Sequence, residues 1–283
     1  LNDTKISQKE LIGTLNTVIF CPEDLQLIKG TPSGRRRFLD MEISQTSATY
    51  YHQLMQYNRL LQQRNAVLKE YRGKNTIPLE EWDLQLADMA SFIVKKRLES
   101  LKKINLLIDL MNRKLTGGLE NLTIGYEQPY MDNGSLEYTK EGFYERIKAA
   151  LPQDRHRLST SVGPHRDDLR FFSDAMDLKK FGSQGQQRTA VLSLKLSELE
   201  FIKSEVGEYP VLLLDDVLSE LDESRRTNLL QFIHKRIQTF ITTTDIHDFK
   251  DLKSVQFISC EGGQVQYGPV SYTHLTLPTI CSV

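Results

Sequence analysis

Apolar residues recur along this chain with two spacings, and the change from one to the other marks the expected elements. The uninterrupted apolar run at residues 211–214, introduced by Pro210, is too short for a buried helix and predicts a strand covered on both faces. A strongly helical segment at 186–201 precedes it, with leucines three or four residues apart. An amphipathic helix at 223–237 and a strand at 239–244 follow. This alternation predicts an α/β fold with a parallel sheet.

The first half of the chain is mostly helical in its pattern. Two long helices are expected at 46–72 and from Pro78 to 115, and the short turn between them, at 73–75, predicts an antiparallel hairpin. The shorter expected strands lie at 11–20, 122–127 and 158–168, and hairpins are expected at 169–178 and 255–267. A helix is expected to begin at 22–24, another to carry 35–37 and a third to cover 139–151, with a turn at 132–135.

Two acidic residues, Asp215 and Asp216, come directly after the buried strand. Ligands of open α/β sheets collect at the carboxyl ends of the strands, so these carboxylates are placed to handle a metal and a phosphate. The first acid would hold Mg²⁺ and the second would lie near an attacking water. An Asp-rich turn after a buried strand is the other interpretation of the same residues.

The helix before this strand opens with Ser183, Gln184, Gly185 and Gln186. A serine and a glycine at a helix start expose a hydroxyl and backbone N–H groups at the positive end of the dipole, which suits an anion. A serine that only caps the helix is the alternative. The order of this helix start, the acid-tipped strand and the segment 219–222 is that of ABC-type ATPase heads: signature, Walker B and D-loop.

These motifs resemble those of the RecF family, the SMC-like DNA repair ATPases of bacteria. The resemblance rests on residues 183–188, 213–222 and 163–168, with a similar N-terminal piece at 20–25, Gly30 and 35–40. It covers about residues 8 to 268.

The resemblance implies an ABC-type (SMC/Rad50-like) ATPase head with an inserted all-helical lobe. Expected domains are a remnant of ATPase lobe I with a coupling segment (1–40), helical lobe II (41–150), and an ATPase lobe with signature, Walker B and D-loop (151–269); we expect 270–283, which fits none of these, to be a non-native tail. The printed residues contain no G-x-x-x-x-G-K-[ST] loop. We therefore expect Walker A to lie upstream of Leu1, and this chain alone neither to dimerise nor to hydrolyse ATP.

By resemblance, the nucleotide site is shared between two protomers, with ATP and Mg²⁺ as cofactors. The predicted roles are ATP contact in trans for Ser183, Gln184, Gly185 and Gln186; the metal for Asp215; catalysis for Asp216; the D-loop for Ser219 and Asp222; a switch for Thr243 or Thr244, with His247 three residues on; and phosphate contacts for Gln26, His165 and Arg166. A solvent-facing Gln26 and a capped turn at 163–168 are the alternatives. Many ABC enzymes have glutamate at the position of Asp216, so slow hydrolysis is expected.

A net charge of −1 gives no global attraction to nucleic acid, so any DNA contact must come from a local patch. Residues 95–114 carry seven basic and two acidic side chains, a formal charge of +5. The candidate DNA contacts are Lys95, Lys96, Lys102 and Lys103, together with Arg35, Arg36 and Arg37. The alternative is a solvated charged face, with one ion pair from the arginines, to Asp40.

The remaining composition is compatible with this reading. The hydrophobic content of 39% suffices for a sizeable core. The three cysteines, Cys21, Cys260 and Cys281, have no CxxC spacing and indicate a reducing compartment. With no apolar run near the length of a membrane span, a cytoplasmic protein is expected.

The function implied by the resemblance is that of an ATP-dependent DNA-binding protein of recombinational repair and replication, with a role in the SOS response. Such a protein binds single-stranded or gapped DNA, dimerises on ATP as a weak ATPase, and loads partners of the RecR and RecO type. Two alternatives stay open at this point: another ABC or SMC-like head, and a non-enzymatic DNA-binding fragment.

Overall fold

The computed structural model describes residues 3–6, 11–71, 78–118, 120–130, 138–244, 255–261, 264–267 and 279–282. A six-stranded sheet has the order β1-β5-β6-β9-β7-β8. Its strands are β1 (Thr17–Phe20), β5 (Val211–Asp215), β6 (Thr239–Thr243), β7 (Gln256–Glu261), β8 (Gln264–Tyr267) and β9 (Thr279–Ser282). All neighbours are parallel except the β7–β8 hairpin. The predicted α/β architecture with a parallel sheet is confirmed.

Helix α9 (Gln184–Val206) forms the centre of the core. It packs against β1 on one side and against the long helix α5 (Glu80–Thr116) on the other, and residues such as Leu192, Leu199 and Ile202 are fully buried. Gly207 ends α9 with a φ of 90°, a left-handed conformation that glycine adopts without strain. The chain then enters β5 within four residues, so α9 begins on the side of the sheet where β5 ends.

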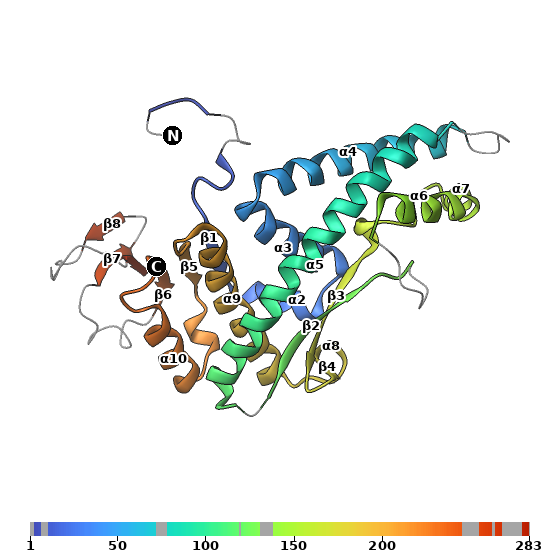
Figure 1. Ribbon diagram of the computed structural model, residues 1–283. Helices are drawn as coiled ribbons and strands as arrows, with labels where there is room; N and C mark the ends of the chain where they lie inside the picture. Colours follow the sequence, from blue (N-terminus) through green and yellow to red (C-terminus); the bar gives the residue numbers. More distant parts are fainter. Residues whose placement is uncertain are drawn as a thin grey trace.

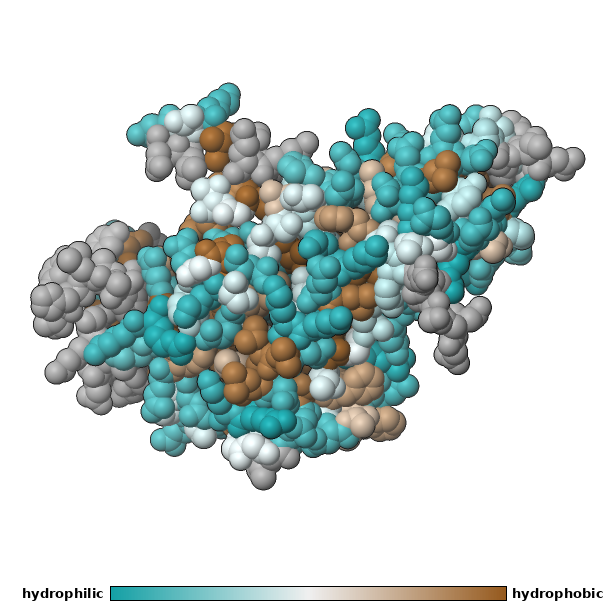
Figure 2. Space-filling view, viewed as in Figure 1, coloured by the Kyte–Doolittle hydropathy of each residue, from teal (hydrophilic) through white to brown (hydrophobic). Residues whose placement is uncertain are grey.

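The predicted helical hairpin is present and forms an arm that extends away from the sheet (Figure 1). Its helices are α4 (Ala48–Glu70) and α5, which pack side by side, and α3 (Pro32–Thr46) leads into them. The end of the arm also carries α6 (Lys140–Ala149), which packs on α5, and α7 (Leu151–Arg157). On the face seen in Figure 2 this arm is largely hydrophilic, although Leu106 of α5 is 76% exposed.

A second, antiparallel sheet crosses one of the expected domain boundaries. It has the order β2-β3-β4, with β2 (Leu122–Glu127), β3 (Asp168–Ser173) and β4 (Met176–Asp177). Because β2 pairs with β3 along its whole length, this sheet spans the expected boundary at residue 150. Helix α3 likewise spans the expected boundary at residue 40. The mostly helical lobe thus contributes one strand to a sheet that it shares with the following segment.

The expected strand at 158–168 is wrong over most of its length. Leu158 and Gly163 have positive φ values, and the short helix η2 (Pro164–Arg166) follows. Asp154 also accepts the Ser161 backbone N–H at 2.8 Å, which removes a group that a strand partner would need. The strand begins only at Asp168.

Smaller elements complete the fold. They are η1 (Pro22–Leu25), α2 (Gln26–Lys29), α8 (Leu178–Phe181), η3 (Leu218–Glu220) and α10 (Glu223–Ile233). The first strand covers 17–20 rather than 11–20, and α8 replaces the end of the predicted 169–178 hairpin. The turns expected at 73–75 and 132–135 lie outside the described residues. Residues 279–282, which the sequence left outside the architecture, pair as β9 between β6 and β7.

Among the described residues, no helix combines the length and the apolar character that a bilayer span requires.

Candidate functional site

The carboxyl end of β5 presents two acidic side chains at the edge of the sheet. Asp215 is the last residue of the strand and Asp216 follows it, and both are exposed. Asp216 has a φ of 51°, in the left-handed region. Aspartate is one of the few residues with a side chain that enters this region readily. This left-handed backbone conformation is a local reason for an aspartate at residue 216, where many ABC enzymes have the longer glutamate.

Thr242 of β6 connects both acids. Its hydroxyl donates to Asp215 Oδ1 at 2.6 Å and accepts the Asp216 backbone N–H at 3.1 Å. Thr242 lies directly opposite Asp215 in the parallel pairing. The sequence had placed the switch at Thr243 or Thr244, but Thr243 is buried and Thr244 lies beyond the strand. The register of β6 against β5 places Thr242, and not Thr243, opposite Asp215. His247 lies outside the described residues.

The start of α9 is an exposed, doubly capped helix terminus. Ser183 Oγ accepts the Gln186 backbone N–H at 3.2 Å, and Gln186 Oε1 accepts the Ser183 backbone N–H at 3.0 Å. Ser183, Gln184 and Gly185 are all exposed. The capping and the anion-site interpretations are thus compatible, because the cap fixes the turn while its outer face stays open.

Ser183 lies more than one helical turn before the residues of α9 that pack near the sheet edge. Arg188 and Val191, in the next turns of α9, line a cavity of about 20 Å³ with Phe20 and Val217, which sit near the ends of β1 and β5. Ser183 precedes Arg188 by five residues, or about 8 Å of helix. The signature start is therefore separated along α9 from the residues that pack against the ends of these strands.

The D-loop residues follow β5 along the chain and are held by local bonds. Ser219 Oγ donates to the Asp216 carbonyl at 2.8 Å. Asp222 caps α10 by accepting the Arg225 backbone N–H at 2.9 Å, and this bond lowers the pKa of its carboxyl. Both residues are exposed at the same edge of the sheet.

His165 is half-buried, and its ring lines a cavity and bonds to residues of its own chain. The Tyr57 hydroxyl bonds Nδ1 at 2.6 Å, and Nε2 bonds the Thr160 carbonyl at 3.0 Å, which assigns the proton to Nε2. Burial lowers the pKa of His165 to about 4, so the ring is neutral at pH 7. Arg166 is exposed and donates to the Thr160 carbonyl at 2.6 Å and 3.0 Å. Gln26, at the start of α2, is also exposed.

The three successive arginines have different surroundings. Arg35 is 3% exposed and grips both Asp168 carboxylate oxygens, at 2.8 Å and 2.9 Å, so it is structural and not a DNA contact. Arg36 donates to the Asp167 carbonyl at 2.7 Å and is partly exposed. Arg37 is exposed. The sequence suggested an ion pair from one of these arginines to Asp40. Arg35 pairs with Asp168 instead, and Asp40 pairs with Arg97 at 2.9 Å.

The lysines of α5 form a weaker basic patch than the sequence suggests. Arg97, which contributes to the formal charge of +5 at 95–114, is only 2% exposed and buried against Asp40. Lys96 pairs with Glu99 at 2.8 Å, and Lys103 pairs with Glu205 at 2.5 Å. Lys95 and Lys102 are exposed.

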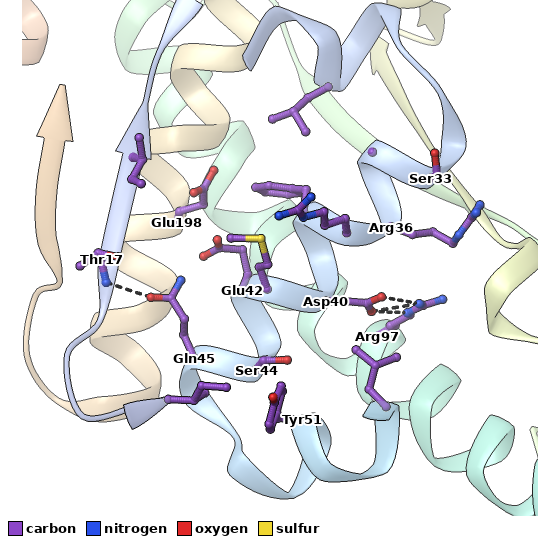
Figure 3. A pocket seen from close by; sticks show the side chains of 18 of the residues that line it. Thr17, Ser33, Arg36, Asp40, Glu42, Ser44, Gln45, Tyr51, Arg97 and Glu198 are labelled. Carbon is purple, nitrogen blue, oxygen red and sulfur yellow. Dashed lines mark hydrogen bonds and ion pairs between the residues drawn. The ribbon is translucent and has the colours of Figure 1, made fainter. Parts of the chain in front are cut away.

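A cavity of about 970 Å³ lies between β1, α3, α4 and α9 (Figure 3). Glu42 and Glu198 face one another on its wall. Each is at most 5% exposed and keeps one carboxylate oxygen without a hydrogen-bond partner. Burial raises the pKa of Glu42 to about 7 and that of Glu198 well above its ordinary value, although Lys195 opposes both shifts. Neither Asp215 nor Asp216 lines this cavity.

Comparisons with known proteins agree with this geometry. No model of a known protein family matches the chain. The DNA replication and repair protein RecF of Alkaliphilus oremlandii is 50% identical over 250 residues, which is 88% of this chain and 68% of that protein. RecF of Halothermothrix orenii is 47% identical over 87% of this chain and 67% of its own length.

Solved structures show the same relationship. A structure described as the recombination mediator protein RecF-ATPrS in the RecFOR pathway has a TM-score of 0.83 and 37% identity, over 93% of this chain and 70% of that one. The corresponding RecF-ATP structure has a TM-score of 0.81 and 38% identity, over 91% and 69%. The likeness extends through the helical arm as well as the sheet, so the predicted ABC-type head architecture is confirmed. The chain belongs to the RecF family of DNA replication and repair proteins.

Proposed function

We propose that this chain acts in recombinational DNA repair as an ATP-dependent DNA-binding protein, with a shared nucleotide site as its switch. The single observation that carries the proposal is the exposed, capped start of α9, which lies on the side of the sheet where β5 ends with its two acids. A helix start in this position can contact a phosphate held by a second protomer. Sequence identity of 50% to a RecF protein supports the assignment.

The residues at the sheet edge fit one part of a Mg²⁺ and nucleotide site. Asp215 offers an exposed carboxylate, and Thr242 holds one of its oxygens at 2.6 Å. The described residues contain no group of three or more metal-ligating side chains, so the other ligands would come from the nucleotide and from residues elsewhere. When bound, Mg²⁺ would neutralise charge on the phosphates.

The chain's own residues would then position the reacting groups. Asp216, fixed by the bond from its backbone N–H to Thr242, would orient the attacking water. Ser183 and the backbone N–H groups of Gln184 and Gly185 would bind the terminal phosphate in trans. Ser219 and Asp222 would lie at the seam between protomers. The shorter reach of an aspartate at residue 216 suits slow hydrolysis in a switch.

DNA and protein partners are the outer part of the proposal. The solved RecF structures are described within the RecFOR pathway. We infer partners of the RecR and RecO type, single-stranded or gapped DNA as the nucleic acid, and the bacterial cytoplasm as the place of action. Lys95, Lys102, Arg36 and Arg37 keep exposed or partly exposed positive charge for DNA contact.

The test uses full-length RecF of Alkaliphilus oremlandii with a labelled form of this chain, in sedimentation velocity experiments. With ATP, we expect a mixed complex in which the start of α9 covers nucleotide bound to RecF. The chain alone with ATP is the control and should stay monomeric, since its printed residues contain no Walker A loop. Ser183→Arg should abolish the mixed complex. Equal association without nucleotide, or an unaffected Ser183→Arg variant, would refute the shared site.

A further inference from the structure

The end of the helical arm has an open cavity of about 480 Å³ whose charged side chains are all arginines. They are Arg146 of α6, Arg157 at the end of α7, and Arg166 of η2. No acidic residue lines this cavity. Residues from three separate elements therefore bring a formal charge of +3 to one site, on a chain whose net charge is −1.

The partners of these arginines are neutral. Arg146 donates to the Tyr130 carbonyl at 2.8 Å, and Arg166 donates to the Thr160 carbonyl. Arg157 reaches the Gln153 amide oxygen at 3.2 Å once that amide is oriented to accept. Among the described residues, none of the three forms an ion pair with a carboxylate, whereas the surface residues Arg113, Arg170 and Arg236 each do.

Two carboxylates next to the site are turned inward. Asp154, on α7, is fully buried and accepts from Arg64 at 2.6 Å. Asp167, next to Arg166, is also fully buried and lies 3.5 Å from Arg97. Glu145 of α6 is exposed but does not line the cavity.

Carbonyl contacts hold the guanidinium groups without neutralising them. Arg166 keeps Nη1 free of any hydrogen bond to the described residues, and Arg146 keeps Nε and Nη2. Guanidinium donors arranged in this way match the oxygens of phosphate groups. The cavity is open to solvent, so a nucleic-acid backbone could reach these donors.

We propose that Arg146, Arg157 and Arg166 form a site for the phosphodiester backbone of DNA, independent of base sequence. This inference rests on the DNA-binding part of the proposed function and assigns it a location at the end of the arm. Two of the four candidate lysines on α5, Lys96 and Lys103, are paired with carboxylates, which makes that helix the weaker candidate.

The experiment measures binding of a labelled 30-nucleotide DNA, single-stranded and as a duplex, by fluorescence anisotropy between 50 and 300 mM salt. Arg157→Gln is the main variant, because the hydrogen bonds of Arg157 to Gln153 stay within α7; Arg157→Lys keeps the charge. Arg113→Gln, an exposed arginine already paired with Asp109, is the matched control. Unfolding midpoints verify that all variants fold.

We expect Arg157→Gln to weaken duplex binding roughly fivefold to tenfold at 0.1 M salt and to lower the salt slope by about 0.9, the value for one lost phosphate contact. The loss should be equal for mixed and homopolymer sequences, and Arg157→Lys should restore most of it. Arg113→Gln should change neither quantity.

Three results would overturn the site. If Arg157→Gln and the double variant Arg157→Gln/Arg166→Gln bind DNA with the native slope, DNA binding stands but occurs elsewhere. If inorganic phosphate binds at these arginines in a titration while DNA binding is unaffected by these variants, the arginines hold a free anion and not DNA. If the native chain binds no DNA at all, both this site and the DNA-binding function proposed for the chain are wrong.

Discussion

Ser183 has two roles in this account, and one substitution can separate them. Its hydroxyl caps α9 through the 3.2 Å bond from the Gln186 N–H, and its outer face is expected to contact a phosphate held by a second protomer. Ser183→Asp keeps the capping acceptor, and a carboxylate at a helix N-terminus is favourable. The same carboxylate would repel a phosphate.

The two effects differ in size. Aspartate and serine are nearly equal as N-caps, so the free energy of unfolding should change by less than about 0.5 kcal/mol, whereas Ser183→Ala should cost about 1 kcal/mol. Two unit charges about 4 Å apart repel by roughly 4 kcal/mol at an effective dielectric constant of 20, or about a thousandfold in affinity. Ser183→Asn, a neutral residue with the same capping ability, is the matched control.

The assay combines urea unfolding of each variant with its ATP-dependent association with full-length RecF. We expect Ser183→Asp to be as stable as the native chain and to lose association, while Ser183→Asn retains most of it. If Ser183→Asp associates with native affinity, Ser183 caps the helix and contacts no phosphate.

Three further predictions concern the stability of the chain, measured by urea unfolding. Arg64→Met should cost about 3–5 kcal/mol, because it leaves the buried carboxylates of Asp83 and Asp154 without their shared cation; a loss under 1 kcal/mol would contradict this reading. Glu42→Gln should stabilise the chain by up to about 3 kcal/mol at pH 8 and by little at pH 4.5. The pKa of Glu42 in the folded chain, about 7, exceeds its value in the unfolded chain, so the native chain loses stability as pH rises from the unfolded to the folded pKa. A stabilisation that does not change with pH would refute this prediction. Gly163→Ala should cost at least about 2 kcal/mol, since its φ is 130° and a Cβ would clash with the Tyr57 hydroxyl; a stability equal to the native chain's would show that the loop relaxes.

Local patterns in the sequence were enough to locate most elements of the fold. The β5 strand, the α4–α5 hairpin and the capped start of α9 all follow from short-range spacing, turn residues and capping chemistry, and the structure confirms each of them. The acids after β5 could be placed at the sheet edge because the end of a strand is itself a local feature. Family membership was also available from motifs read along the chain.

Pairing across the sequence was decided only in three dimensions. Thr242 meets Asp215 because of the register between two strands 27 residues apart, and no local signal distinguishes it from Thr243. Arg35 and Arg97 count as surface charge in the sequence, yet both are buried against carboxylates from distant segments. Sequence spacing reports which face of an element a residue occupies, but the net charge at a surface depends on which partners the fold brings to it. The arginine site at the end of the arm is assembled from three elements, so only the tertiary structure reveals it.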